Sequence, residues 1–166
     1  MSQVDFKLYL ITDRKLSGER GLIDTVEAAL GAAAEFGPRP PIAVQLREKD
    51  LDGRALMQLA VELGQTCRRY HVPMLVNGRI DVALAARADG VHLPSDGISV
   101  EDARKLLGPS KLIGVSTHTA AEITGAEGNR PTLNPLFQGA GPNLHWLGVR
   151  PRFARDLAQA GFEALR

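Results

Sequence analysis

The chain has 166 residues, of which 44% are hydrophobic, and its 20 Lys and Arg nearly balance its 19 Asp and Glu. This length suits one domain with a substantial core and leaves too little chain for two well-packed domains. The net charge of +1 argues against a broadly basic surface for nucleic acid or membranes, so an anion site would have to be local. We expect no signal peptide or membrane span, and the single cysteine, Cys67, predicts a buried, inert thiol in a cytoplasmic protein without an internal disulfide.

Short apolar strands alternate with amphipathic helices over most of the length. In chain order the predicted elements are the strand Lys7–Thr12, the helix Leu22–Phe36, the strand Ile42–Leu46, the helix Asp52–Tyr70, the strand Met74–Val76, the helix Ile80–Ala86, the strand Gly90–Leu93, the helix Val100–Leu107, the strand Leu112–Ser116 and the helix Ala120–Ala126. Asp52 and Ser99 are candidate N-caps. This alternation predicts an α/β fold with a parallel sheet.

The pattern changes after Gly128, where the chain becomes rich in proline and asparagine. Only Thr132–Phe137 is a candidate sixth strand, and Pro151–Leu165 is a predicted final helix with proline in its first turn. A complete (β/α)8 barrel typically needs about 200 residues or more. We therefore predict a parallel (β/α) barrel of the TIM type that is incomplete, with five clear units and one weak one. Residues 1–128 would form its core, and residues 129–166 a divergent tail within the same domain.

Three long polar side chains, Gln45, Arg47 and Lys49, alternate at the end of the predicted strand Ile42–Leu46. Alternation in an extended chain places all three on one face. Arg offers a planar fork and Lys a mobile point charge, so the pattern predicts phosphate binding. The alternative is a solvated rim, in which Arg47 and Lys49 pair with the neighbouring carboxylates Glu48, Asp50 and Asp13.

Polar residues also follow the other predicted strands. Because the carboxyl ends of parallel strands gather on one face, we expect these residues to share a rim with Arg47. Asn77 is a candidate ligand, although Asn followed by Gly is also a common turn pair. His92 lies inside an apolar strand, where a core histidine is as reasonable as a functional one. Ser116 and His118 alternate at a strand end and are candidate site residues.

Five segments together resemble thiamine phosphate synthase and its relative, the thiazole tautomerase. They are Tyr9–Asp13, Gln45–Lys49, Val76–Ala83, Ala88–Leu93 and Ile113–Thr119. The resemblance implies a (β/α)8 barrel that acts in thiamine biosynthesis. The synthase joins an aminopyrimidine methyl pyrophosphate to a thiazole phosphate and releases pyrophosphate. By resemblance, the residues that bind these small phosphorylated substrates are Gln45, Arg47, Lys49, Asn77 and Ser116.

The chain departs from the family pattern at the implied magnesium site and beyond residue 128. The positions that usually carry the two Mg²⁺ aspartates are Gly78 and Gly97, so the adjacent Asp96 becomes the candidate metal ligand. The family's sixth-strand loop is echoed only by Asn134–Phe137, without its lysine. The seventh and eighth strands have no counterpart.

Three functions remain open at this point. The first is a synthase acting through the phosphate-binding residues. The second is a tautomerase, which needs no Mg²⁺ and for which His118 is the candidate proton shuttle, because imidazole titrates near neutral pH. The third is an inactive, truncated family member. In an incomplete barrel the edge strands are unpaired, which predicts association between copies of the chain.

Overall fold

The computed structural model describes residue 6 and residues 8–35 and 37–116. Its strands are β1 (Leu8–Ile11), β2 (Ile42–Leu46), β3 (Met74–Asn77), β4 (Gly90–Leu93) and β5 (Leu112–Val115). Its α-helices are α1 (Leu22–Ala34), α2 (Gly53–Arg69), α3 (Ile80–Ala85) and α4 (Val100–Leu107), and two short 3₁₀ turns follow β1 at Arg14–Leu16 and Gly18–Arg20. The predicted elements at 120–126, 132–137 and 151–165 lie outside the described residues.

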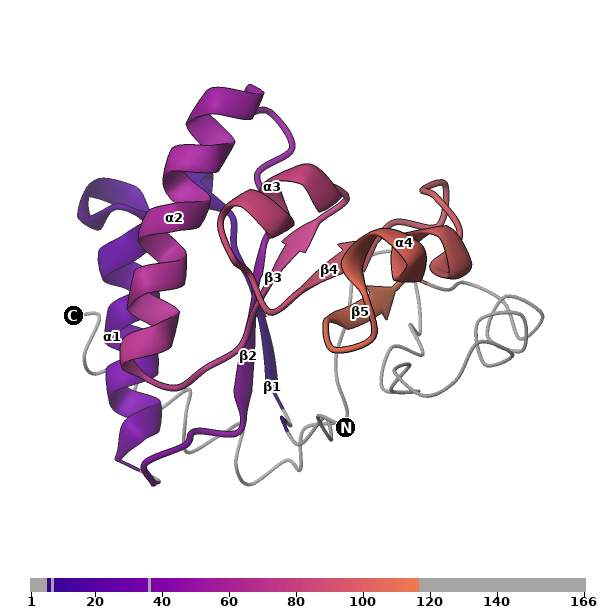
Figure 1. Cartoon of the computed structure of the whole chain (residues 1–166). Helices are drawn as coiled ribbons and strands as arrows, with labels where there is room; N and C mark the ends of the chain where they lie inside the picture. Colours follow the sequence, from indigo (N-terminus) through magenta and orange to yellow (C-terminus); the bar gives the residue numbers. More distant parts are fainter. Residues whose placement is uncertain (1–5, 7, 36, 117–166) are drawn as a thin grey trace.

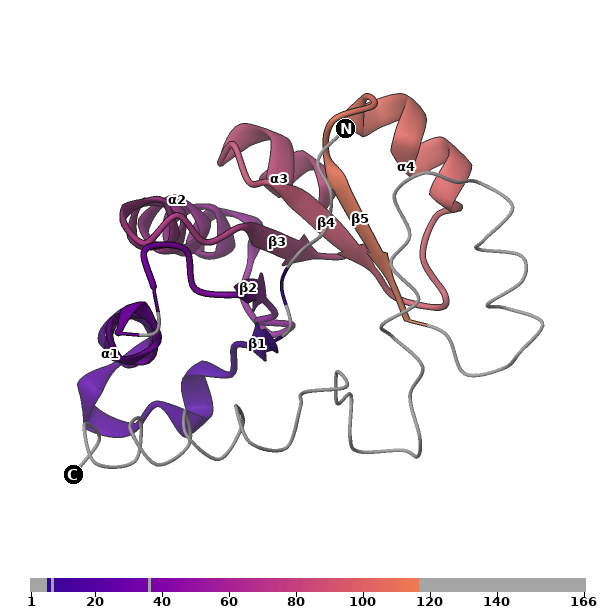
Figure 2. The ribbon, with the colours of Figure 1, turned by 90° about the horizontal axis from the view of Figure 1, so that it is seen from below.

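The described strands form one parallel sheet in the order β1-β2-β3-β4-β5, each paired with the next. Figure 1 shows the helices on one side of this sheet. Seen from below, in Figure 2, α1 to α4 follow one another along the outside of a curved row of strands. The predicted α/β fold is therefore confirmed as a half-barrel of five parallel strands. The part of the prediction that concerns closure of the barrel falls on residues 117–166, which lie outside the described residues.

Local signals in the sequence explain where the helices begin and end. Asp52 caps α2, its carboxylate accepting a hydrogen bond from the amide of Ala55 at 2.9 Å, and Ser99 caps α4 in the same way. Both N-cap predictions are confirmed. The helix α1 ends at Ala34, two residues before the predicted end. Gly37, at φ +142°, donates its backbone amide to the carbonyl of Ala34 and turns the chain out of the helical direction.

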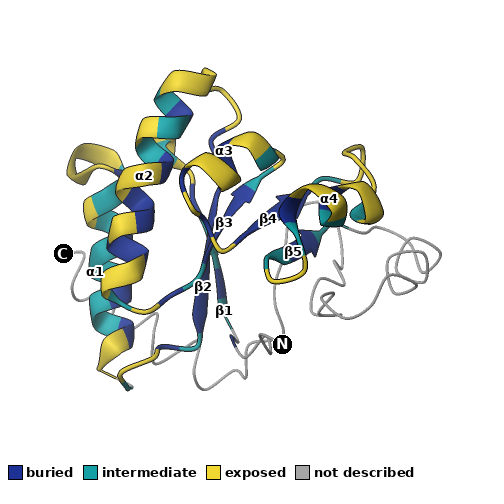
Figure 3. Ribbon diagram, viewed as in Figure 1, coloured by how far each residue is buried: buried dark blue, intermediate teal, exposed yellow. Residues whose placement is uncertain are grey.

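Alternation along the strands separates two faces of the sheet. The outer face carries apolar side chains such as Val44, Leu46 and Val76, which pack with Leu30 and Leu63 from the helices and are all at most 1% exposed. Figure 3 shows the same division, with the buried sides of the helices turned toward the strands and the exposed sides turned away. Burial of this face supplies most of the apolar stabilisation of the described fold.

The inner face mixes apolar and polar side chains. Phe6, Tyr9, Ala43 and Leu75 form a small buried cluster, in which the rings of Phe6 and Tyr9 stack with their centroids 5.7 Å apart. Further along the strands, Gln45 and other polar residues replace the apolar ones. The inner face is thus closed by packing at the amino ends of the strands and becomes polar toward their carboxyl ends.

Cys67 lies on α2 and is 1% exposed. Burial raises the pKa of its thiol to about 12, so the thiol stays protonated and unreactive at neutral pH. The predicted buried, inert cysteine is confirmed. Every helix among the described residues is too short or too polar to span a bilayer.

Candidate functional site

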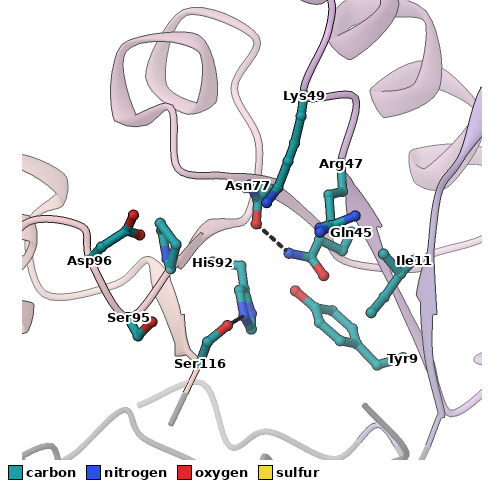
Figure 4. A pocket seen from close by; sticks show the side chains of 11 residues that line it. Tyr9, Ile11, Gln45, Arg47, Lys49, Asn77, His92, Ser95, Asp96 and Ser116 are labelled. Atoms are coloured by element: carbon teal, nitrogen blue, oxygen red, sulfur yellow. Dashed lines mark hydrogen bonds between the residues drawn. The ribbon is translucent and has the colours of Figure 1, made fainter. Parts of the chain in front are cut away.

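A cavity of about 340 Å³ opens at the carboxyl ends of the strands, on the inner face of the half-barrel (Figure 4). Its described lining comes from all five strands or the residues just after them: Tyr9, Ile11, Gln45, Arg47, Lys49, Asn77, His92, Pro94, Ser95, Asp96 and Ser116. The volume is suitable for a small ligand. All five predicted substrate-binding residues and Asp96 line this one cavity, while their roles as ligands stay a prediction.

Gln45 and Asn77 form a hydrogen-bonded pair on the floor of the cavity. Gln45 is 1% exposed, and its side-chain amide donates to the Oδ1 of Asn77 at 2.9 Å (Figure 4). The two residues sit on the neighbouring strands β2 and β3. With Oδ1 occupied by this bond, the NH₂ group of Asn77 remains as a hydrogen-bond donor for an anionic ligand.

Arg47 and Lys49 reach the cavity from the loop after β2 (Figure 4). Within the described part of the chain neither side chain forms an ion pair. The nearby carboxylates are engaged elsewhere: Glu48 bonds the hydroxyl of Thr12, and Asp50 lies 3.0 Å from the Nη2 of Arg14. The carboxylate pairing that the alternative required is therefore not observed among the described residues. Both cations remain exposed, and both line the cavity.

Thr12 and Glu48 form a buried connection behind these cations that sequence analysis did not identify. Glu48 is 6% and Thr12 3% exposed. The Thr12 hydroxyl donates to Oε1 of Glu48 at 2.8 Å and accepts from the backbone amide of Arg47 at 2.9 Å. The same carboxylate accepts from the backbone amide of Arg14 at 3.1 Å. This connection ties the loop after β1 to the loop after β2 and holds the backbone of Arg47.

One feature of the sequence could have revealed the role of Glu48. It stands between Arg47 and Lys49, so alternation turns its carboxylate away from the face that they share. A carboxylate that is turned away from the cavity needs hydrogen-bond donors from an adjacent loop. Thr12 is available for this, because it follows β1, the strand beside β2. Asp50, on the exposed side of the loop, is paired as well. It accepts hydrogen bonds from Arg14 and Lys15, and these hold the pKa of its carboxyl well below the usual value.

His92 is buried and also lines the cavity. It therefore has the burial expected of a core histidine and the position expected of a site residue. Its Nε2 lies 2.9 Å from the Oγ of Ser116, and its ring centroid lies 5.8 Å from that of Tyr9. Burial raises the pKa of the Tyr9 phenol well above its usual value. Gly114, the register partner of His92 on β5, leaves room for the imidazole, since a Cβ there would lie 2.7 Å from Nδ1.

The remaining predicted site residues differ in what the structure says of them. Asp96 lines the cavity and is the one carboxylate among its described lining residues. No group of three or more His, Cys, Asp or Glu in the described part of the chain could hold a metal ion. His118 lies outside the described residues, so its role as a proton shuttle stays a prediction.

The chain is similar to known proteins over most of its length. A family model described as thiamine monophosphate synthase matches residues 8–140. A thiamine-phosphate synthase from Clostridium acetobutylicum is 41% identical over 132 residues, which cover 80% of this chain and 59% of the relative. One from Azorhizobium caulinodans is 36% identical over 163 residues, covering 98% of this chain and 71% of the relative.

Among solved structures, a thiamine phosphate pyrophosphorylase from Pyrococcus furiosus matches with a TM-score of 0.68 and 28% identity. The match covers 95% of this chain and 82% of that one. The chain spans about half the length of most of the curated relatives it matches, with shares of 52%, 59% and 47% in three of them.

Proposed function

The chain belongs to the thiamine monophosphate synthase family, and from this premise we propose that it acts in thiamine biosynthesis as a thiamine phosphate synthase. The reaction joins an aminopyrimidine methyl pyrophosphate to a thiazole phosphate and releases pyrophosphate. The observation that carries the proposal is the pair of cations, Arg47 and Lys49, which face the cavity while Arg14 and Lys15 take up the nearby Asp50.

Charge moves in one direction during this reaction. The bond between the pyrimidine methylene carbon and the pyrophosphate oxygen breaks, and its electron pair leaves with the pyrophosphate. The thiazole nitrogen then supplies the electron pair of the new carbon–nitrogen bond. Negative charge therefore grows on the leaving oxygens, where fixed cations and hydrogen-bond donors stabilise the transition state more than the ground state.

The described residues divide this work by their chemistry. Arg47 can contact two phosphate oxygens at once, and Lys49 adds a second, more mobile charge. Asn77, oriented by Gln45, offers a neutral donor beside them. The hydroxyl of Ser116 lies 2.9 Å from Nε2 of His92, on the opposite side of the cavity (Figure 4). When that nitrogen carries the ring proton, the hydroxyl accepts from it and can donate its own hydrogen to a phosphate oxygen.

The test is turnover by the full 166-residue chain with both substrates at saturating concentration. We expect thiamine phosphate and pyrophosphate to appear in equal amounts, measured by chromatography and by a coupled pyrophosphate assay. No product under saturating substrates would overturn the proposed reaction.

A matched pair of lysine variants separates the cavity from general surface charge. Lys49→Ala removes a cation of the cavity and is expected to lower kcat/KM about 10-fold or more, the equivalent of one lost charge-assisted contact. Lys105→Ala removes an exposed lysine on α4 that pairs with Glu101, and should leave kcat/KM unchanged. Equal effects of the two variants would contradict the assigned role of the cavity.

A further inference from the structure

The part of the cavity wall formed by the loops after β3 and β4 has a single carboxylate among its described residues. Family resemblance implies a Mg²⁺ ion near positions 78 and 97, but both are glycine. Mg²⁺ is generally held in octahedral geometry by one or two carboxylates together with substrate phosphates. Neither glycine supplies a side-chain oxygen, and Asp96 is the one described carboxylate in the cavity, so the residues present do not fit a site that holds Mg²⁺ through two aspartates.

Pro94 lies against both glycine positions. A Cβ on Gly97 would lie 3.0 Å from the carbonyl oxygen of Pro94 and 3.1 Å from its Cδ. A Cβ on Gly78 would lie 3.7 Å from the same Cδ. One apolar ring therefore takes up the space beside both residues, and a side chain at Gly97 would require Pro94 to move. Beside positions 78 and 97 the wall therefore presents an apolar ring, and Asp96 is the one described carboxylate left there to meet a metal ion.

The opposite wall carries charge of the sign that an anion needs. Arg47 and Lys49 line the cavity against a single described carboxylate, Asp96, and Glu48 is turned away toward Thr12. A diphosphate without a bound metal presents its full negative charge to these cations. Mg²⁺ bound to the diphosphate neutralises part of that charge and occupies oxygens that Arg47 would otherwise contact.

From this distribution we propose that the chain binds the diphosphate group directly through Arg47 and Lys49, and that Mg²⁺ weakens this binding. The inference rests on the proposed function of the same cavity and deepens it. It makes the metal-free diphosphate the species that the cavity recognises. Mg²⁺ therefore changes the affinity in the direction opposite to that of a metal-dependent site.

The experiment is calorimetric titration of the full chain with inorganic pyrophosphate, first in EDTA and then with increasing Mg²⁺. We expect binding in EDTA and a rise of about 10-fold in the apparent Kd when Mg²⁺ exceeds pyrophosphate, the equivalent of one lost charged contact. Binding that requires Mg²⁺, or that tightens with it, would overturn this inference and leave the proposed function intact. No binding in either condition would overturn the diphosphate site itself.

A combined variant, Gly78→Asp with Pro94→Gly and Gly97→Asp, tests the role of the wall. Gly78 has φ +66°, a conformation that aspartate tolerates better than most residues, and the change at Pro94 makes room at position 97. We expect Mg²⁺ to tighten pyrophosphate binding to this variant. The control, Pro94→Gly alone, adds no carboxylate. Mg²⁺ should weaken its binding of pyrophosphate, as it does for the unmodified chain. Circular dichroism checks that the variants are folded. If the folded combined variant still bound pyrophosphate more weakly with Mg²⁺, the missing carboxylates at positions 78 and 97 would not be the reason for the effect.

Discussion

The loop after β2 places charged residues on two sides, and the two sides differ in how those charges are satisfied. On the outer side Glu48 and Asp50 are held by donors from the loop after β1, with Arg14 contacting both. On the inner side Arg47 and Lys49 face the cavity, and no described carboxylate pairs with them. A pair of cations stays available for a ligand because the neighbouring acids are neutralised elsewhere. The proposed anion site therefore depends on residues that do not line the cavity, Arg14 among them.

The largest expected effect comes from breaking the buried connection on the outer side. Glu48→Ala leaves the Thr12 hydroxyl and the Arg14 amide without their acceptor, which we expect to lower the free energy of unfolding by about 2–4 kcal/mol. Glu48→Gln keeps an acceptor oxygen and should lose less. Urea unfolding followed by circular dichroism measures both variants. A loss below about 0.5 kcal/mol for Glu48→Ala, the usual range for surface substitutions, would show that the connection is not structural.

Removing a cation on the inner side should affect the ligand and leave the fold unchanged. Arg47→Ala is expected to weaken pyrophosphate binding about 10- to 100-fold with little change in urea unfolding, because no described residue pairs with its side chain. Calorimetric titration in EDTA gives the affinity. If unfolding changed as much as binding, the contrast between the two sides of the loop would fail.

A smaller effect on pyrophosphate affinity is expected when a carboxylate on the outer side of the loop is left to compete for the cations on the inner side. Arg14→Ala leaves Asp50 without its main partner, so that carboxylate can attract Arg47 or Lys49 from the cavity. We expect pyrophosphate affinity to fall roughly two- to fivefold, in the range of exposed ion pairs, and the loss to shrink in high salt.

Adding Asp50→Asn to Arg14→Ala removes the competing charge and should restore the affinity. The same calorimetric titration, repeated on the single and double variants, measures this recovery. Failure of the second substitution to restore binding would show that Asp50 does not compete for the cations of the cavity.

The smallest effect concerns an exposed pair outside the cavity. Arg79 lowers the pKa of Asp81 from 3.8 to about 2. The native state therefore binds fewer protons than the unfolded state between these values. The stability from this pair is present above about pH 4 and is lost as the pH falls toward 2.

Asp81→Asn should consequently cost roughly 0.2–1 kcal/mol at pH 7, the range of exposed ion pairs. At pH 2 the variant and the unmodified chain should differ much less, because Asp81 is then about half protonated in the native state and almost fully protonated in the unfolded state. Thermal melts of both proteins at pH 7 and pH 2 measure how this difference in stability changes with pH. A difference that grows on acidification would contradict it.

Much of the described fold could be predicted because its signals are local. The bounds of β2, β4 and α4 match their predicted ranges, since alternation, a capping serine and a terminating glycine all lie within a few residues. The shared face of Gln45, Arg47 and Lys49 could be predicted for the same reason. The end of α1 was predicted too late, because the residues favourable to a helix continue in the sequence as far as Phe36, whereas the helix itself ends at Ala34.

The sequence by itself determined the class of the fold, the family and the identity of the cations at the cavity, because periodicity and motif spacing act over short stretches of chain. Tertiary structure decided which charges stay available. Whether Arg47 pairs with a carboxylate depends on Thr12 and Arg14, more than 30 residues away, and whether positions 78 and 97 can hold a metal depends on Pro94 between them. The contacts of Thr12 and Arg14 with the loop after β2, and of Pro94 with Gly78, join loops of neighbouring strands, and only the packing of the sheet brings them together.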